Sequence, residues 1–395
     1  RAETESRNGV TDTLAVLSKE EARAVFDSKL YKKHIQPLWI EIVNDTDELI
    51  IFLPRGVDPF YFSSLEAAQK VLKGNKSAKR EKRIFFYEQQ IPYQVPAGQT
   101  VSGFVFGNRD IGMRFATVEV FGDSLHERFE FLQEVPGFKA DYQKLKGENA
   151  FEILYPEQQI IDLTSHQELK AWVEKQPCCT ENAKGTKQGD PVNLVIVGTE
   201  DTVWPAFAKS GWDPTAALTT GSALWTGVKG IFGGAWRNSP ISELYFFGRP
   251  QDIALQKVRS NIHYRNHIRL WLAPITYQGK GVLMGQISRD IGTRITTKSP
   301  TLTTHRIDPD VDETRASLIQ DFLSLQMLEA FMRVGGVGEA TPESPRQNLT
   351  GDVYFTDGKR AVMFLTGTPT PVLDIDLLHE LEEEIVKGQE PLREP

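Results

Sequence analysis

The period of the apolar positions changes several times along the chain, and each change predicts an element. From Leu38 the period is two, so LWIEIV at 38–43 and LIIFL at 49–53 predict two strands joined by the turn at 44–47. The same alternation predicts four more strands, at 91–95, 103–106, 114–121 and 127–132. Short strands at this spacing, separated by turn residues, are typical of an immunoglobulin-like β-sandwich. We therefore predict such a domain over residues 36–136.

Three segments of this first part read differently. Residues 1–17 are polar and without a strong pattern, which predicts a leader or docking arm. Ser18 and Glu21 have the spacing of a capping box, so a helix is expected to follow and to complete a segment at 1–35. Residues 73–83 (KGNKSAKREKR) predict an exposed basic loop, either simply solvated or in contact with an acidic partner or an anionic lipid surface.

The second part of the chain mixes strands and helices. Residues 137–190 read as a connector with one helix, capped by Ser165 and Glu168. PVNLVIVG at 191–198 is a continuous apolar run, as in a strand buried on both faces. Other predicted elements are strands at 244–247, 267–272 and 282–287, helices at 222–232 and from Asp310 to about Phe331, and a hairpin of 352–356 with 360–365. An α/β domain with a central sheet is thus expected over 191–375, before an acidic tail at 376–395 that could form a docking helix.

These elements together predict an α+β, multidomain protein, and a length of 395 residues is sufficient for two or three cores. The formal charge of −8 argues against a nucleic-acid partner, because phosphate binding requires clustered cations. No apolar run is long enough to span a bilayer. Cys178 and Cys179 are adjacent and cannot join distant segments; they form either a vicinal disulfide or, as we slightly favour, two reduced thiols.

Isolated cations among the predicted strands of the second domain suggest a binding site. Arg249 opens a turn after a strand, Lys257 follows, and Arg269 and Arg289 lie on or beside strands. If the sheet gathers them, they would form a pocket for a phosphate, sulfate or carboxylate, since guanidinium groups match these oxyanions. The alternative is a set of structural ion pairs, for which Arg249 with Asp252 and Arg289 with Asp290 are ready candidates.

Candidate acid–base groups accompany these cations. His267 lies on a predicted strand, and His305 precedes Asp308 by three residues. With the arginines they could hydrolyse a phosphoester. Their spacing matches no metal motif, and the acidic run at 308–312 lacks the Gly and Glu of a calcium loop, so we expect no metal and no cofactor. Carboxylates at this position more often cap the helix that follows. No nucleophile motif is present.

Five segments carry a family resemblance. They are PVNLVIVG (191–198), SPISELYFFGRPQDIALQK (239–257), HIRLW (267–271), SRDIG (288–292) and THRIDPDVDETR (304–315). In order and spacing they resemble the C-terminal domain family named after the LssY protein, over about residues 190–335. The resemblance implies work at the cell envelope, since some relatives join this domain to membrane modules similar to phosphatidic-acid phosphatases. It implies no settled activity.

Two hypotheses follow. The first is a cell-envelope or secreted binding and assembly protein with an anion-recognising pocket, whose partner is another protein or an anionic small molecule. Peripheral membrane association is compatible with it, and the oligomeric state stays open. The alternative is a hydrolase of phosphoesters or related esters that uses His267 or His305 in an arginine-lined pocket.

Overall fold

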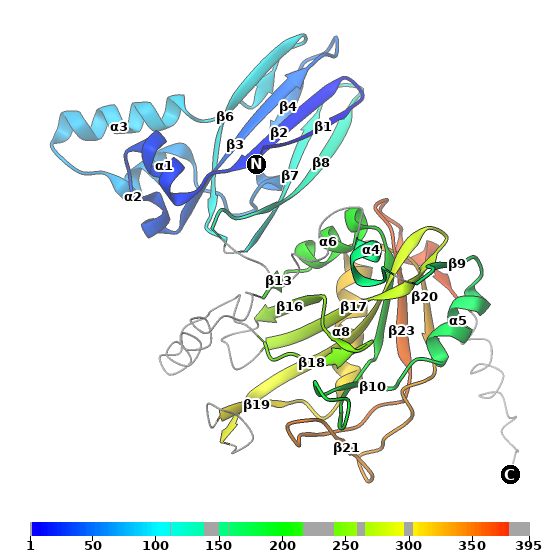
Figure 1. Cartoon of the computed structure of the whole chain (residues 1–395). Helices are drawn as coiled ribbons and strands as arrows, with labels where there is room; N and C mark the ends of the chain where they lie inside the picture. Colours follow the sequence, from blue (N-terminus) through cyan, green and yellow to red (C-terminus); the bar gives the residue numbers. More distant parts are fainter. Residues whose placement is uncertain are drawn as a thin grey trace, which may run out of the picture. The chain divides into compact units, whose positions relative to one another are not determined.

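The computed structural model describes residues 2–110, 112–137, 150–156, 158–215, 241–258, 265–295 and 303–378, of which 293–295 and 303–305 are described as backbone only. The chain divides into two compact units, 1–138 and 139–395 (Figure 1). Both contain helices and several sheets, so the predicted α+β, multidomain class is confirmed.

The N-terminal unit contains two four-stranded antiparallel sheets. The first has the order β1 (Glu3–Arg7), β2 (Val10–Val16), β3 (Ile35–Asn44) and β6 (Gln99–Asn108). The second has the order β5 (Gln94–Val95), β4 (Ile50–Leu53), β7 (Met113–Phe121) and β8 (His126–Glu134). Apolar side chains of both sheets, among them Leu14, Ile40, Val118 and Phe129, form a single buried cluster. The two sheets therefore pack face to face, as in a sandwich.

Two expectations for this unit are wrong. Residues 1–17 contain β1 and β2, which pair with each other and with β3, rather than a leader. The strands β3 and β4 do not form a hairpin, because β4 pairs with β5 and β7 in the other sheet. The Asn44 amide donates to the carbonyls of Glu48 and Val95, at 2.9 Å each, and so holds the chain where it crosses between the sheets.

Helices cover one end of the sandwich (Figure 1): α1 (Lys19–Phe26), the short η1 (Leu30–Lys33) and η2 (Pro54–Gly56), α2 (Ser64–Val71) and α3 (Lys76–Glu88). The capping box of Ser18 and Glu21 is present as predicted. The basic segment at 73–83 is largely helix rather than loop, because Asn75 caps α3 by accepting from the Ala78 amide at 3.0 Å. Phe86 of α3 then packs into a cluster of buried aromatic rings with Phe26 and Phe106.

A ten-stranded sheet organises the C-terminal unit. Its main path runs β13 (Asp213–Pro214), β16 (Ile253–Val258), β17 (Arg265–Tyr277), β18 (Lys280–Ile295), β12 (Leu194–Gly198), β23 (Arg360–Leu365), β20 (Leu328–Val334) and β24 (Asp376–Leu377). Two more strands join it, β9 (Ile161–Leu163) on β17 and β19 (Thr303–Ile307) on β18. All five residues of β12 are buried, which confirms the predicted central strand. The predicted strands at 267–272 and 282–287 are confirmed within β17 and β18.

Both faces of this sheet are covered. On one face, α5 (His166–Glu174) packs Leu169 and Val173 against Trp271, Met284 and Phe364. On the other lie α6 (Glu200–Lys209) and α8 (Val311–Ser324), whose Phe207 and Phe322 rings meet edge to face. Smaller elements complete the unit: α4 (Ala150–Leu154), the 3-10 helix η4 (Val372–Asp374), and two small sheets formed by β10 (Cys179–Glu181), β11 (Gln188–Pro191), β14 (Tyr245–Phe246) and β15 (Arg249–Pro250), and by β21 (Arg346–Gln347) with β22 (Val353–Tyr354).

The C-terminal elements also differ from expectation. The helix expected to reach Phe331 ends at Ser324, because Gln326 is left-handed with φ 58° and the chain returns as β20. The expected hairpin is wrong as well, since β22 pairs with β21 while β23 pairs with β12 and β20. The helix expected at 222–232 and most of the acidic tail lie outside the described residues.

Candidate functional site

Polar side chains replace the apolar core at one end of the sheet face that α5 covers. Three neighbouring strands contribute them, in the register Gln256 of β16, His267 of β17 and Ser288 of β18. Since alternate residues of a strand share a face, this face also holds Arg265, Arg269, Gln286 and Asp290. All of these side chains are at least nine-tenths buried. We call these seven residues the polar strip.

Asp290 is the centre of the polar strip. Its Oδ2 lies 2.6 Å from Nε2 of His267 and 3.4 Å from Nε of Arg265, and Arg265 also donates to Oε1 of Gln256 at 2.6 Å. Burial lowers the pKa of His267 to about 4, outweighing the attraction of Asp290. The imidazole is therefore neutral at pH 7. If its proton is on Nε2, facing Asp290, then Nδ1 is a bare acceptor, and it has no partner in the described structure.

Arg269 occupies the other end of the strip. It donates to Oε1 of Gln286 at 2.9 Å and, through two nitrogens, to the Ser242 carbonyl at 3.1 Å. Burial lowers the pKa of Arg269, and the carboxylates of Asp190 and Asp290 oppose that shift. Burial likewise raises the pKa of Asp190, which accepts from the Asn348 amide at 3.0 Å. The Arg269 guanidinium is thus hydrogen-bonded to groups of the protein itself.

The predicted cations do not gather in one pocket. Lys257 and Arg289 pair in register with Asn266, which places them on the opposite face from His267 and Arg269. There they meet acidic residues of α8: Lys257 lies 2.8 Å from Asp321, and Arg289 contacts Glu313. The sequence pattern could not reveal this separation, because the face on which a cation lies depends on the register of three strands.

Arg249 forms a structural ion pair, as the alternative interpretation expected. Its Nε and Nη2 donate to Asp252 at 2.9 and 2.7 Å, and it also bonds the Tyr155 hydroxyl at 2.8 Å and the Leu272 carbonyl at 2.7 Å. Arg289, by contrast, pairs with Glu313 and not with Asp290, which belongs to His267 and Arg265.

The remaining candidates, His305 and Asp308, come shortly before α8 in the chain. His305 is on β19, opposite Thr293, and its side chain is outside the described part of the structure. Asp308 accepts from the Asp310 amide at 3.2 Å, and Asp310 in turn caps α8 by accepting from the amides of Asp312 and Glu313. The interpretation of this acidic run as a helix cap is confirmed.

Sequence reasoning missed the partners that complete the strip. Arg265, Asp290, Gln256 and Gln286 were not named as site residues, although RNHIRLW and QISRD each place polar residues at alternate positions. That alternation is the signal that could have found them. It indicates a polar continuation of one sheet face.

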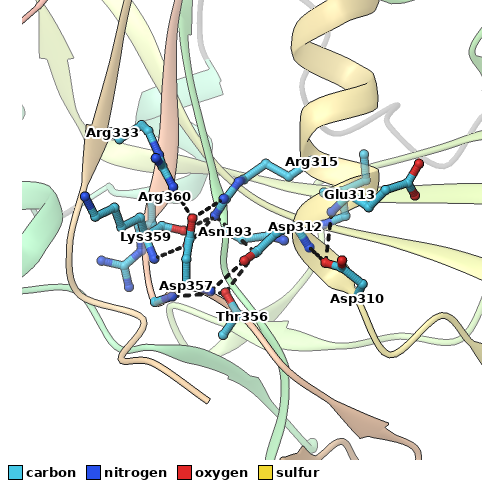
Figure 2. A network of polar contacts seen from close by, with 12 residues as sticks. Asn193, Asp310, Asp312, Glu313, Arg315, Arg333, Thr356, Asp357, Lys359 and Arg360 are labelled. Carbon is cyan, nitrogen blue, oxygen red and sulfur yellow. Dashed lines mark hydrogen bonds and ion pairs between the residues drawn. The ribbon is translucent and has the colours of Figure 1, made fainter. Parts of the chain in front are cut away.

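A second polar network pins α8 to the far side of the sheet (Figure 2). Arg315 donates to both oxygens of Asp357, at 3.0 and 2.7 Å, and Arg333 of β20 contacts the same carboxylate. Asp312 accepts from the Thr356 hydroxyl at 2.8 Å and from the Asp357 amide. Burial opposes ionisation of Asp357, but Arg315 and its other donors still lower its pKa. These groups satisfy one another and hold the helix in place.

A surface groove lies at the start of α5, with a volume of about 290 Å³. The ring of His166 stacks on Tyr277 in its wall, with centroids 5.6 Å apart. The lining mixes apolar, hydroxyl, amide and cationic groups: Thr164, Ser165, His166, Gln167, Lys170, Tyr277, Gln278, Met332, Arg333 and Leu378. Lys170 is exposed and has no ion-pair partner among the described residues. Within those residues, no group of His, Cys, Asp and Glu side chains is arranged to hold a metal ion.

Cys178 and Cys179 are joined by a disulfide bond, so the reduced pair that we slightly favoured is wrong. Cys179 is buried, and its sulfur lies 3.8 Å from the Tyr354 hydroxyl. The neighbouring carbonyls of Gln176 and Pro177 accept from Arg360, a fully buried guanidinium.

The polar strip and most strands of the ten-stranded sheet lie in the part of the chain where a family can be recognised. Residues 173–359 match the model of the family described as LssY C-terminus. The second unit contains an LssY C-terminal domain. The match reaches from the end of α5 to the turn before β23, somewhat beyond the predicted 190–335, and the N-terminal unit has no family assignment.

Comparisons with curated proteins and with solved structures add little information about the chain beyond this family match. No curated protein matches the chain. A crystal structure of "a putative lipoprotein (ycdA)" from Bacillus subtilis is similar at 10% sequence identity and a TM-score of 0.18, over 68% of this chain and 73% of that chain. This similarity is too low to indicate a shared fold. In the described parts of the chain, no helix has the length and apolarity to cross a membrane.

Proposed function

We propose that this chain is a binding and assembly protein of the cell envelope or extracellular space, and not a hydrolase. The observation that carries the proposal is the pairing of the candidate catalytic groups. His267 is 5% exposed, is bonded to Asp290, and has a pKa of about 4. A general base works best with a pKa near the operating pH and within reach of substrate. His267 meets neither condition, so the polar strip stabilises the sheet.

The groove at α5 is the proposed ligand site. Lys170 supplies positive charge there, Arg333 lines the groove while also contacting Asp357, and Tyr277, Met332 and Leu378 supply apolar surface. Such a mixture is typical of small-molecule sites, in which a few polar groups orient the ligand. An anionic small molecule fits these cations best, which moves the predicted anion site from Arg249, Lys257, Arg269 and Arg289 to another part of the LssY C-terminal domain.

Location and the N-terminal fold belong to the same proposal. A disulfide such as Cys178–Cys179 persists best in an oxidising compartment, which supports a place outside the cytoplasm. In the first unit, the pairs β2–β3, β3–β6, β4–β7 and β7–β8 follow the order expected of strands A–B, B–E, C–F and F–G in an immunoglobulin-like sandwich. Sandwiches of that type serve mainly in recognition, which agrees with an assembly role.

Thermal denaturation of the full chain with matched ligand panels tests the groove. We expect the Tm to rise with anionic compounds (carboxylates, sulfates and phosphates) and not with neutral analogues. Lys170→Glu should weaken binding by about tenfold or more, because a charge-assisted contact becomes a repulsion. Lys175→Glu, an exposed lysine at the end of α5 and outside the groove lining, is the matched control. Equal responses of the two variants would contradict the proposed site.

One observation favours the hydrolase as a second candidate. Ser288 lies directly across from His267 in the strand register, and Asp290 contacts Nε2 of that histidine, so a serine, a histidine and an aspartate share one face. Chromogenic phosphomonoesters, phosphodiesters and carboxylic esters, with and without divalent metals, test this arrangement. Hydrolysis that disappears in both His267→Ala and Ser288→Ala would establish the enzyme and overturn our proposal. We expect no turnover above that of the two variants.

A further inference from the structure

We propose that the outward face of α3 is a docking surface for a lipid bilayer that carries anionic headgroups. This inference concerns the N-terminal unit and does not depend on the groove in the LssY C-terminal domain. Seven Lys or Arg residues and one Glu lie between residues 70 and 83, whereas the whole chain has a formal charge of −8. The region is therefore strongly basic within an acidic protein.

The contacts of α3 separate the cations that stabilise the fold from those that do not. Lys82 donates to the Phe26 carbonyl at 2.8 Å, and Arg83 donates to Gln69 at 2.9 Å. Lys70 lies over the Phe62 ring at 5.0 Å. In contrast, Lys76 and Arg80 are exposed and have no ion-pair partner in the described part of the chain. Their positive charge is available to a partner.

Apolar side chains lie on the same outward face. Phe86 is fully buried and Phe85 is partly buried, so these two rings mark the inward side of α3. On the other side, Lys76, Arg80, Ile84 and Tyr87 follow one another at intervals of three and four residues. Ile84 is 45% exposed and Tyr87 is 65% exposed. A stripe in which two cations are followed by an exposed aliphatic and an exposed aromatic side chain is unusual on a surface that meets only water. We call these four residues the α3 stripe.

The chemistry of the α3 stripe matches a membrane surface better than a soluble acidic protein. Lys and Arg attract anionic headgroups, while a tyrosine and an aliphatic side chain insert at the boundary between headgroups and acyl chains. Figure 1 shows α3 among the helices at one end of the sandwich, away from most of both sheets of that unit. The helix can meet a flat surface along its length without any change in the sandwich core.

Vesicle flotation with the full chain tests the inference. Wild-type protein should float with phosphatidylcholine vesicles that contain about 30% phosphatidylglycerol, and much less with phosphatidylcholine alone. Lys76→Glu/Arg80→Glu should lower the partition coefficient by at least about tenfold, because two attractions become repulsions. Ile84→Ser/Tyr87→Ser should also weaken binding, most clearly at high salt, where screening removes the electrostatic part. Circular dichroism checks that α3 is intact in each variant.

The matched control carries the same change in charge on the other unit. Lys184→Glu/Lys187→Glu alters two exposed lysines outside α3 and should leave flotation unchanged. Equal flotation with neutral and anionic vesicles, or equal losses in the control and the α3 stripe variants, would overturn the inference. A failure to float with either vesicle would overturn it too and would favour an acidic protein partner. None of these outcomes touches the groove, so the two proposals fail separately.

Discussion

Replacing Asp12 by Asn removes a carboxyl group from the interior of the N-terminal sandwich. Asp12 lies on β2 between Val10 and Leu14, with no exposed surface, and neither of its oxygens has a hydrogen-bond partner in the described structure. Burial, together with the nearby charge of Glu5, raises its pKa from 3.8 to about 8. An ionised carboxylate in this place is strongly unfavourable.

The sign and size of the effect follow from linkage. Between pH 4 and 8 the folded state holds a proton on Asp12 that the unfolded state has lost, so stability falls as pH rises through this window and is level above it. A shift of about four units corresponds to at most about 6 kcal/mol, at about 1.4 kcal/mol per unit. Relaxation and water penetration reduce such values, so we expect about 2–4 kcal/mol.

Guanidinium unfolding of the full chain between pH 5 and 9 measures this. Hydrogen exchange in peptides from β2 and β3 assigns the change to the sandwich. Asp12→Asn should be within about 1 kcal/mol of wild type at pH 5 and more stable by about 2–4 kcal/mol at pH 8.5. Asp47→Asn removes an exposed carboxylate nearby and should keep the wild-type pH dependence. The reasoning is refuted if Asp12→Asn keeps it as well.

Three further predictions concern packing and charge. Gly103→Ala should destabilise the sandwich by about 3 kcal/mol or more in denaturant unfolding, because the new Cβ would lie 2.5 Å from the Ile91 amide nitrogen; an unchanged midpoint would contradict that contact. Asp357→Asn should destabilise the LssY C-terminal domain by about 1.5–3 kcal/mol, since it removes one of the two carboxylates that the buried guanidinium of Arg315 contacts and leaves only Asp312, and unchanged exchange protection of α8 would count against the network of Figure 2. The His267 imidazole should stay neutral down to about pH 5 in NMR titration, so that stability is lost as the pH falls from about 6.5 towards 4; a titration near 6.5 would show that it is not buried.

Local signals in the sequence predicted local features well. The capping boxes at Ser18 and Ser165, the cap at Asp310 and the buried strand β12 all depend on residues close together in the chain. Their chemistry acts within one or two turns, so the sequence is sufficient. Errors arose where a local pattern was compatible with two structures, as at 73–83, where a run of charges is equally suited to a loop and to the solvated face of α3.

Pairing between distant strands was harder to predict. Period-two runs on both sides of 44–47 suggested a hairpin, but each strand found partners elsewhere, β3 with β2 and β6, and β4 with β5 and β7. The positions of the candidate cations depend on the same kind of long-range pairing. Arg269 and Arg289 are both cations on neighbouring strands, yet the register places one on the face of the polar strip and the other against α8. One residue of slip would exchange them.

The sequence by itself determined many of the strands and helices, where several of them begin, and that residues from about 190 onward form an LssY C-terminal domain. These properties depend on propensity, capping and motif order, which neighbouring residues decide. Only the tertiary structure decided that Asp290 belongs to His267 and Arg265, that Lys257 and Arg289 meet the acids of α8, and that the face of α3 bearing Ile84 and Tyr87 is left uncovered. These ion pairs depend on strand register and helix packing, because both bring together residues that are far apart in the chain.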